Sequence, residues 1–129
     1  MYKKVAPMFL VDDVDKAVSF YQEVFGARLR HSLPDAPPFE WVSILLEDME
    51  IMFWKNDAAQ KEYPDAALIS HKPGNVIVYV YVEEIDKLYE RIQDKVTVVM
   101  EPKDQSYGIR EFTIRDPFGF IWTFAQIKE

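Results

Sequence analysis

The sequence of 129 residues contains no cysteine, which excludes a disulfide framework, a thiolate zinc site and a cysteine nucleophile. Basic residues are in the minority, because 15 lysines and arginines stand against 22 acids and give a formal charge of −7. Such a surface repels phosphate backbones, and no stripe of basic residues is present, so we do not expect nucleic acid as a partner. No apolar run approaches about 20 residues, so we expect no membrane partner, and the absence of a signal-peptide pattern favours the cytoplasm.

The chain does contain one long-range repeat. Residues 11–17 read VDDVDKA and residues 82–88 read VEEIDKL, an offset of 71. Each position keeps its chemical type, and the offset exceeds half of the chain. A period of this length indicates a duplicated half-domain, since solenoid arrays have a period of about 20 to 50 residues. With 49% hydrophobic residues, the chain suits a single domain covering residues 1–129.

The sequence around each copy predicts the same order of elements. A β-type run precedes each copy, at residues 5–11 and 76–82, and the second of these reads VIVYVYV. A helical pattern follows each copy, and in the first half Asp13 caps its start while Gly26 ends it. We therefore predict an α+β fold of two βαβββ modules, forming a curved eight-stranded mixed sheet with helices on the outside.

The predicted modules span residues 1–56 and 76–129, and residues 57–75 connect them with one helical turn near residues 58–62. Further strands are expected at residues 41–47, 50–54, 95–100, 109–115 and 120–127. The DPFG segment at residues 116–119 predicts a turn before the last strand. In this turn proline fixes φ, the aspartate bonds the backbone, and glycine permits a positive φ.

Three of these features together resemble the vicinal oxygen chelate superfamily, which includes glyoxalase I, extradiol dioxygenases, fosfomycin-resistance enzymes and bleomycin-resistance proteins. They are the βαβββ duplication, the VDDVDKAVSFY stretch at residues 11–21 that leads to Phe25 and Gly26, and the RDPFG turn at residues 115–119. The order and spacing of these motifs carry the resemblance, which covers essentially the whole chain. It implies this family's fold and a small-molecule site.

In metal-using members of that superfamily, His, Glu or Gln ligands lie on four strands around an open coordination site. The resemblance places those positions at Ala6, Met52, Ile77 and Thr123, in two pairs that are each 71 residues apart. At best Thr123 supplies a neutral hydroxyl, so these four residues do not make a divalent metal site. The resemblance therefore implies no metal or other cofactor, and no catalytic constellation in the sequence points to an enzyme.

Two segments are closest to the bleomycin-resistance branch, which is metal-free. Residues 49–54 read MEIMFW and residues 107–112 read YGIREF, which resemble that branch's third strand and the segment before its Asp-Pro-x-Gly turn. Members of the branch are described as homodimers that trap a cationic, aromatic antibiotic in grooves at the subunit interface. The resemblance implies a homodimer that sequesters a small ligand, with antibiotic binding and resistance as the family role. Tyr107 and Phe118 differ from the branch's usual residues, which leaves the ligand open.

Strand alternation indicates which side chains point toward the position of the family's metal site. Met52 and Trp54 share one strand face, and Tyr79 shares a face with the metal-site position Ile77. These side chains either line a cavity for a flat, apolar ligand or simply fill the core, and the sequence supports both interpretations equally.

Other candidates come from the loops and the seventh strand. Phe39 and Trp41 flank a proline-rich loop edge, which cannot bury two large rings on its own. Arg110 and Glu111 are adjacent in a strand and face opposite ways, so one braces the fold and the other faces the groove or the dimer. The predicted ligand-binding residues are Phe39, Trp41, Met52, Trp54, Tyr79, Tyr107, Arg110, Phe112 and Thr123.

Two other functions are compatible with the sequence. One is a divergent glyoxalase-family lyase or isomerase whose metal site uses residues other than those aligned above. The other is a protein that binds a metabolite for sensing or regulation. Metal stoichiometry separates the lyase or isomerase from a binding protein. The two histidines, His31 and His71, are expected at the surface and in no catalytic or metal role.

Overall fold

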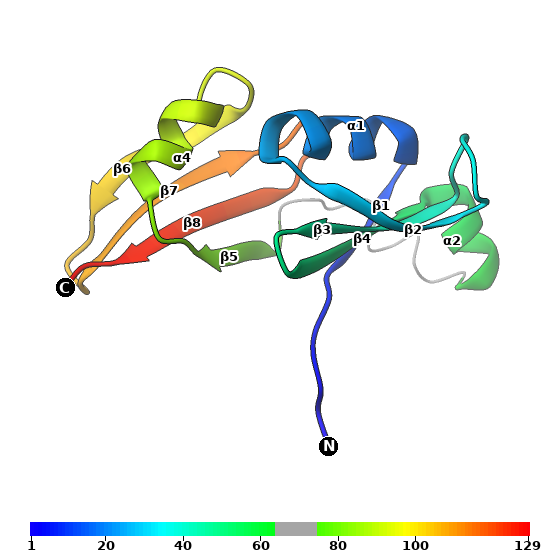
Figure 1. Ribbon diagram of the computed structural model, residues 1–129, viewed down its shortest axis with the longest axis horizontal. Helices are drawn as coiled ribbons and strands as arrows, with labels where there is room; N and C mark the ends of the chain where they lie inside the picture. The colour runs from blue at the N-terminus through cyan, green and yellow to red at the C-terminus, as the bar shows by residue number, and fades with distance from the viewer. Residues whose placement is uncertain (64–74) are drawn as a thin grey trace. The chain divides into compact units, whose positions relative to one another are not determined.

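The computed structural model describes residues 1–63 and 75–129, which form eight strands and three helices. These residues fall into two compact units that correspond to the two halves of the repeat. Each unit contains one four-stranded mixed sheet and a helix that covers one of its faces (Figure 1). The predicted α+β fold of two βαβββ modules is confirmed, and its eight strands are divided between two four-stranded sheets.

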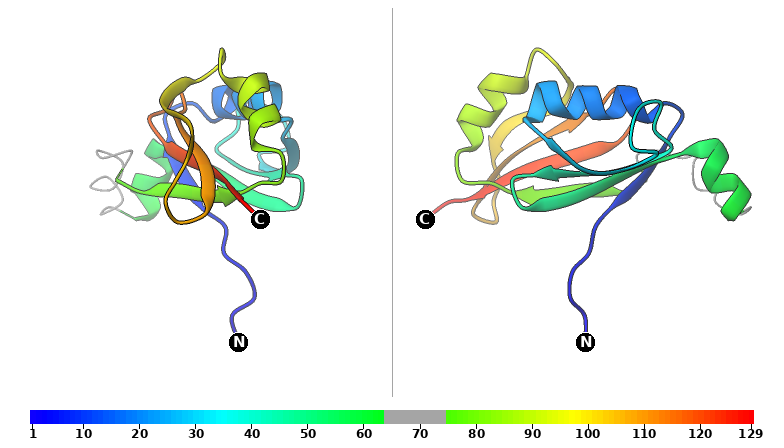
Figure 2. Two further views of the ribbon diagram at one scale, coloured as in Figure 1. Left: turned by 90° about the vertical axis from the view of Figure 1, so that its left-hand side faces the viewer. Right: turned by 45° about the vertical axis from the view of Figure 1, so that its right-hand side comes forward.

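The first unit begins with strand β1 and helix α1, continues through a meander of three strands, and ends with helix α2. Its elements are β1 (Met8–Val11), α1 (Val14–Phe25), β2 (Arg28–Leu33), β3 (Trp41–Leu46), β4 (Met49–Lys55) and α2 (Asn56–Glu62). The strand order is β1-β4-β3-β2, with β1 parallel to β4. Helix α1 lies along one face of this sheet, and α2 extends beyond the end of β4 (Figure 2).

The second unit repeats this arrangement of strands around a shorter helix. Its elements are β5 (Ile77–Tyr81), α4 (Ile85–Ile92), β6 (Thr97–Asp104), β7 (Ile109–Arg115) and β8 (Ile121–Ile127). The strand order is β5-β8-β7-β6, with β5 parallel to β8. Helix α4 covers the face that carries Trp122 and Phe124, which are 1% and 3% exposed.

The strand registers show that the repeat is structural. Met8 lies beside Met52 where β1 pairs with β4, and Tyr79 lies beside Thr123 where β5 pairs with β8. Adding 71 to the first pair of residue numbers gives the second pair. The two halves therefore share one register at their parallel strand pairs as well as a motif.

Helix α1 begins and ends at the predicted residues. The Asp13 side chain accepts a hydrogen bond of 3.1 Å from the N–H of Lys16, which satisfies a donor at the helix start. Gly26 ends the helix in the left-handed region at φ +72°, and its N–H bonds the carbonyl of Gln22. Helix α4 differs, because Glu84 stands at its start without bonding a backbone N–H through its side chain.

Some element boundaries differ from the sequence prediction. Strand β1 begins at Met8 rather than residue 5, and Pro7 before it offers only its carbonyl, which accepts from the N–H of Met52. Strand β6 starts at Thr97 and runs on to Asp104, with two register shifts against β7. Residues 64–74 of the predicted connection, including His71, lie outside the described residues.

Alternation along the strands gives each sheet a second face that its own helix does not cover, here called the helix-free face. Phe53 and Phe112 mark the helix-covered faces, since their rings lie 5.2 Å from Tyr21 of α1 and 5.1 Å from Tyr89 of α4. On the first sheet, the helix-free face carries Met8, Trp41, Ser43, Glu50, Met52 and Trp54. On the second sheet, it carries Tyr79, Tyr81, Glu111, Thr113, Thr123 and Ala125.

Among the described residues, no helix has the length and the apolar character that a membrane crossing needs.

Replacing Asp13 by alanine should lower the free energy of unfolding by about 1 kcal/mol, because the N–H of Lys16 loses its side-chain acceptor. The matched control is Glu84, which occupies the same position in the second half and makes no such bond. Glu84→Ala should change stability by less than about 0.5 kcal/mol. Urea denaturation measures both variants, and equal losses would show that Asp13 does not act through its capping bond.

Candidate functional site

The helix-free face of the second sheet carries a buried carboxylate held by two phenols. Glu111 on β7 is 6% exposed, and its two oxygens accept hydrogen bonds from Tyr79 on β5 and from Tyr107, the latter at 2.6 Å. Strand β8 lies between β5 and β7, and its residues Thr123 and Ala125 have small side chains. Because these side chains are small, the Tyr79 ring reaches across β8 to Glu111. Tyr79, Tyr107 and Glu111 are called the phenol–carboxylate cluster below.

Both phenols of the cluster stay protonated at neutral pH. The hydrogen bond to Glu111 raises the pKa of Tyr79, and burial adds to the effect. The same two causes, in the same order, raise the pKa of Tyr107. A phenolate beside the carboxylate would bring two negative charges together, which disfavours ionisation. The two tyrosines therefore act as hydrogen-bond donors rather than as bases.

Aromatic surface remains accessible around this carboxylate. Tyr79 is 41% exposed, and the Tyr81 ring meets it edge to face at 5.4 Å. Tyr107, in the loop between β6 and β7, is 60% exposed and precedes Gly108, whose φ is +80°. The Thr123 hydroxyl, on the same face, is already paired with Thr113 at 2.8 Å. The cluster thus offers exposed rings and a negative charge at one place.

The helix-free face of the first sheet has an acid of a different kind. Glu50 on β4 accepts hydrogen bonds from Ser43 and from Lys4, and Arg30 Nη1 lies 3.7 Å from its Oε2. The bond from Lys4 is the main cause that lowers the pKa of Glu50, and the bond from Ser43 is the second. Two bases thus offset the charge of Glu50, whereas the phenol–carboxylate cluster contains only neutral donors around its acid.

Most of the predicted ligand-binding residues lie on or beside the helix-free faces. Trp41, Met52 and Trp54 are on the first sheet, Tyr79 and Thr123 are on the second, and Tyr107 is in the adjoining loop. Trp41 and Trp54 are partners in the register of β3 and β4, and the Trp54 ring contacts Tyr63 at 5.8 Å. Within each unit, the residues that the sequence selected by strand parity do share a face.

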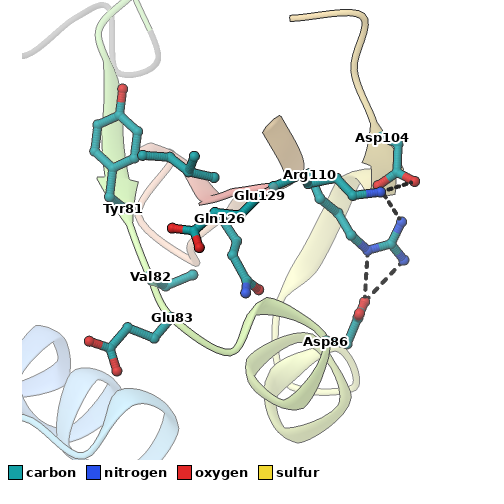
Figure 3. Close-up of a pocket in the computed structure, with 10 residues that line it drawn as sticks. Tyr81, Val82, Glu83, Asp86, Asp104, Arg110, Gln126 and Glu129 are labelled. Atoms are coloured by element: carbon teal, nitrogen blue, oxygen red, sulfur yellow. Dashed lines mark hydrogen bonds and ion pairs between the residues drawn. The ribbon is translucent and has the colours of Figure 1, made fainter. Parts of the chain in front are cut away.

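Phe112 and Arg110, which the sequence predicts as ligand-binding residues, lie on the opposite face of the sheet from the phenol–carboxylate cluster. Phe112 is fully buried, because its register partner on β8 is Phe124 and both rings face α4. Arg110 shares that side, and its guanidinium bonds Asp86 and Asp104 (Figure 3). The predicted opposition of Arg110 and its neighbour is confirmed, with Arg110 bracing the helix side.

Phe39 is also placed differently from its prediction as an exposed loop residue. It is 9% exposed, and its N–H donates a hydrogen bond of 3.0 Å to Asp15 Oδ1 in the first turn of α1. This bond holds the loop before β3 against the helix start, so the ring is buried while Trp41 stays on the helix-free face.

The carboxylates at the centre of both faces were absent from the predicted site residues. For Glu111, the sequence contains only its shared strand parity with Thr113, and the structure adds that Thr113 lies opposite Thr123. For Glu50, the signal was parity with Met52 on β4. What the sequence could not supply was the strand pairing that brings Ser43 to Glu50 and Tyr79 to Glu111.

The positions of the family's metal ligands do not fit a metal in this chain. Met52 and Ile77 offer no oxygen or nitrogen from their side chains, and the Thr123 hydroxyl is bonded to Thr113. Across residues 1–63 and 75–129, no three His, Cys, Asp or Glu side chains gather closely enough to hold a metal ion.

Comparison with known sequences identifies relatives along nearly the whole chain. The profile of the Glyoxalase/Bleomycin resistance protein/Dioxygenase superfamily matches residues 5–124. An uncharacterized protein of Mycobacterium tuberculosis is 26% identical over 125 residues, which are 95% of this chain and 73% of the relative. An uncharacterized protein of Mycobacterium bovis is equally similar, and the match covers 82% of its length.

Comparison with solved structures shows the same fold. A glyoxalase/bleomycin resistance protein/dioxygenase from Nocardioides superposes with a TM-score of 0.80 at 18% identity, over 100% of this chain and 86% of its own. TioX from Micromonospora sp. ML1 superposes with a TM-score of 0.73 at 20% identity, over 96% of this chain and 95% of its own. The structural likeness agrees with the sequence profile, and the chain therefore belongs to the Glyoxalase/Bleomycin resistance protein/Dioxygenase superfamily.

Proposed function

We propose that this chain binds a small aromatic, positively charged molecule and sequesters it without chemical conversion or a metal, in the manner of the bleomycin-resistance branch. The observation that carries the proposal is the phenol–carboxylate cluster, in which Glu111 is bonded by Tyr79 and Tyr107. A carboxylate surrounded by aromatic rings attracts an organic cation through its charge and through the faces of the rings.

The protonation states support binding rather than acid–base chemistry. Raised pKa values keep Tyr79 and Tyr107 as neutral phenols, so neither is a base at neutral pH. Each oxygen of Glu111 already accepts one phenol hydrogen bond. The cluster is thus a fixed negative centre with two donors in place, which recognises charge and shape. The formal charge of −7 would also favour the approach of a cation.

The ligand groove is proposed to lie at the interface of a homodimer. Large apolar side chains are exposed on described residues of the strand edges and loops, among them Leu33, Ile77, Tyr81, Tyr107 and Ile127. Exposed apolar surface of this kind favours association, and Trp41, Met52 and Trp54 would supply further flat surface to an aromatic ligand. An antibiotic is one class of ligand with this chemistry.

The Glu111→Gln substitution should weaken the binding of a planar cation about tenfold, because it removes the negative charge of the side chain and keeps its shape. The measurement is the thermal shift of the full chain with bleomycin and with ethidium. A bound ligand at about 100 times its dissociation constant stabilises the wild type by roughly 2.7 kcal/mol. Tyr107→Ala should reduce the same shift by removing an exposed ring.

The matched control for this experiment is Glu101→Gln, which removes one charge from an exposed position on β6. It should leave the ligand-induced shift unchanged. Equal shifts for all variants would remove the phenol–carboxylate cluster from the binding site, and the absence of any shift with either ligand would count against the proposed function itself.

The alternative function is a lyase or isomerase with a non-standard metal site. Elemental analysis distinguishes it from the proposed metal-free binding protein. Protein purified without chelator or affinity-tag metal should contain less than about 0.1 metal ion per chain, since the aligned side chains are poor ligands. Adding back Ni²⁺, Mn²⁺, Zn²⁺ or Fe²⁺ should not raise its melting temperature. One tightly held metal ion per chain would contradict the binding proposal and support the enzyme.

The lowered pKa of Glu50 predicts that the free energy of unfolding depends on pH. The stabilisation is present above the unfolded-state pKa, about 4.5, and is lost as pH falls through the lower folded-state pKa. Lys4→Ala removes the main cause of the shift, so its destabilisation should shrink in acid. Denaturation at several pH values measures this, with Lys3→Ala as the control. A difference that does not depend on pH would exclude the Lys4–Glu50 pair as its source.

A further inference from the structure

The second unit contains a wide hollow at the end of β5 and β8, beside the start of α4 (Figure 3). Its volume is about 760 Å³, within the range of small-molecule sites. The hollow is lined by Tyr81, Val82, Glu83, Asp86, Asp104, Arg110, Gln126, Ile127, Lys128 and Glu129.

The first half of the repeat shows what occupies the corresponding place. By the offset of 71, Gln126 corresponds to Lys55, after which α2 begins. Helix α2 packs against β1 and β4, and its residue Ala59 is fully buried. In the second half, the hollow lies at the corresponding place, beside the end of β8.

The contact that α2 makes in the first half shows which groups the hollow can recognise. Asp12 Oδ1 accepts a hydrogen bond of 2.7 Å from the side-chain amide Nδ2 of Asn56, the first residue of α2. The residue that corresponds to Asp12 in the second half is Glu83, which lines the hollow. An acid at this position thus binds an N–H donor in one half and is available for one in the other.

The charges of the hollow favour a cationic donor. Its lining has four acids and two bases, so it carries two excess negative charges. Arg110 is paired with Asp86 at 3.0 Å, and Asp104 is paired with Lys128 at 2.8 Å. The excess belongs to Glu83 and Glu129, for which no ion pair is found among the residues described in the structure. In Figure 3, Arg110 turns toward Asp86 and Asp104, away from Glu83.

We propose that the hollow binds a small organic cation whose N–H-bearing head pairs with Glu83 and whose apolar body lies against Tyr81 and Ile127. These two side chains are 61% and 60% exposed, so they offer apolar surface beside the acid. This second site centres on Glu83 rather than on Glu111, and it adjoins the phenol–carboxylate cluster where the Tyr81 ring contacts Tyr79 at 5.4 Å. An amidinium, guanidinium or ammonium group on an aromatic or aliphatic body has the required chemistry.

Benzamidine is the probe, and neutral benzamide, which has almost the same shape, is its control. In a nuclear magnetic resonance titration of the full chain, benzamidine should shift the backbone amides of Glu83, Gln126 and Ile127 in a saturable manner. Benzamide should bind at least about fivefold more weakly, because its neutral amide can donate a hydrogen bond to a carboxylate but carries no positive charge for an ion pair. Equal binding of the two compounds would overturn the proposal.

Variants of Glu83 test whether the cation binds in the hollow. Glu83→Gln should weaken benzamidine binding about threefold, as expected for an accessible ion pair, and Glu83→Lys should abolish it. Glu90→Gln removes the same charge from an exposed position of α4 outside the hollow, and it should leave the affinity unchanged. Equal effects of the Glu83→Gln and Glu90→Gln variants would overturn the proposal.

The same titration separates this site from the one under the proposed function. Shifts confined to Tyr79 and Thr123, lost in Glu111→Gln and retained in Glu83→Gln, would overturn the second site and support the phenol–carboxylate cluster. Shifts at Gln126 and Ile127 that persist in Glu111→Gln would support the hollow even if the cluster binds no ligand.

Discussion

The parallel pairing of the first and last strand of each half is the constraint on which the structure depends. A parallel pair needs a crossover, and in each half a helix supplies it and covers one sheet face. The other face then collects side chains from strands that are distant in sequence. Tyr79 reaches Glu111 only because β5 is brought beside β8, which in turn pairs with β7. The candidate site is thus a product of topology, since its residues come from β5, β7 and the loop that precedes β7.

The two halves share a skeleton and differ in the chemistry that they place on it. In the first half, the acid on the helix-free face is balanced by Lys4 and Arg30. In the second half, the acid on the helix-free face is bonded by neutral phenols. An acid that is already paired with two bases is a poor binding site for a further cation. An acid that is bonded only by neutral donors keeps its negative charge available to attract a cation. The second half is therefore the better candidate for recognition, although the strand registers are alike.

Local patterns in the sequence were sufficient to predict the repeat, the fold class and the limits of α1. These features depend on neighbouring residues: Asp13 bonds Lys16, and Gly26 takes the left-handed conformation that ends a helix. The position of Phe112 could not be predicted in this way. Its burial follows from the register of β7 and β8, which the turn between Arg115 and Ile121 sets. Phe39 is a similar case, because a hydrogen bond to Asp15, 24 residues away, decides its burial. Strand parity predicted which sheet face each residue lies on, and long-range contacts determined which residues meet on that face.

The raised pKa values of the two cluster phenols have a consequence for chemical reactivity. Reagents such as iodine and tetranitromethane modify tyrosine through its phenolate, which is the electron-rich form of the ring. Tyr79 and Tyr107 hold their protons beside Glu111, so little phenolate forms there at mildly alkaline pH. Although both rings are accessible, they are protected from these reagents by electrostatics rather than by burial.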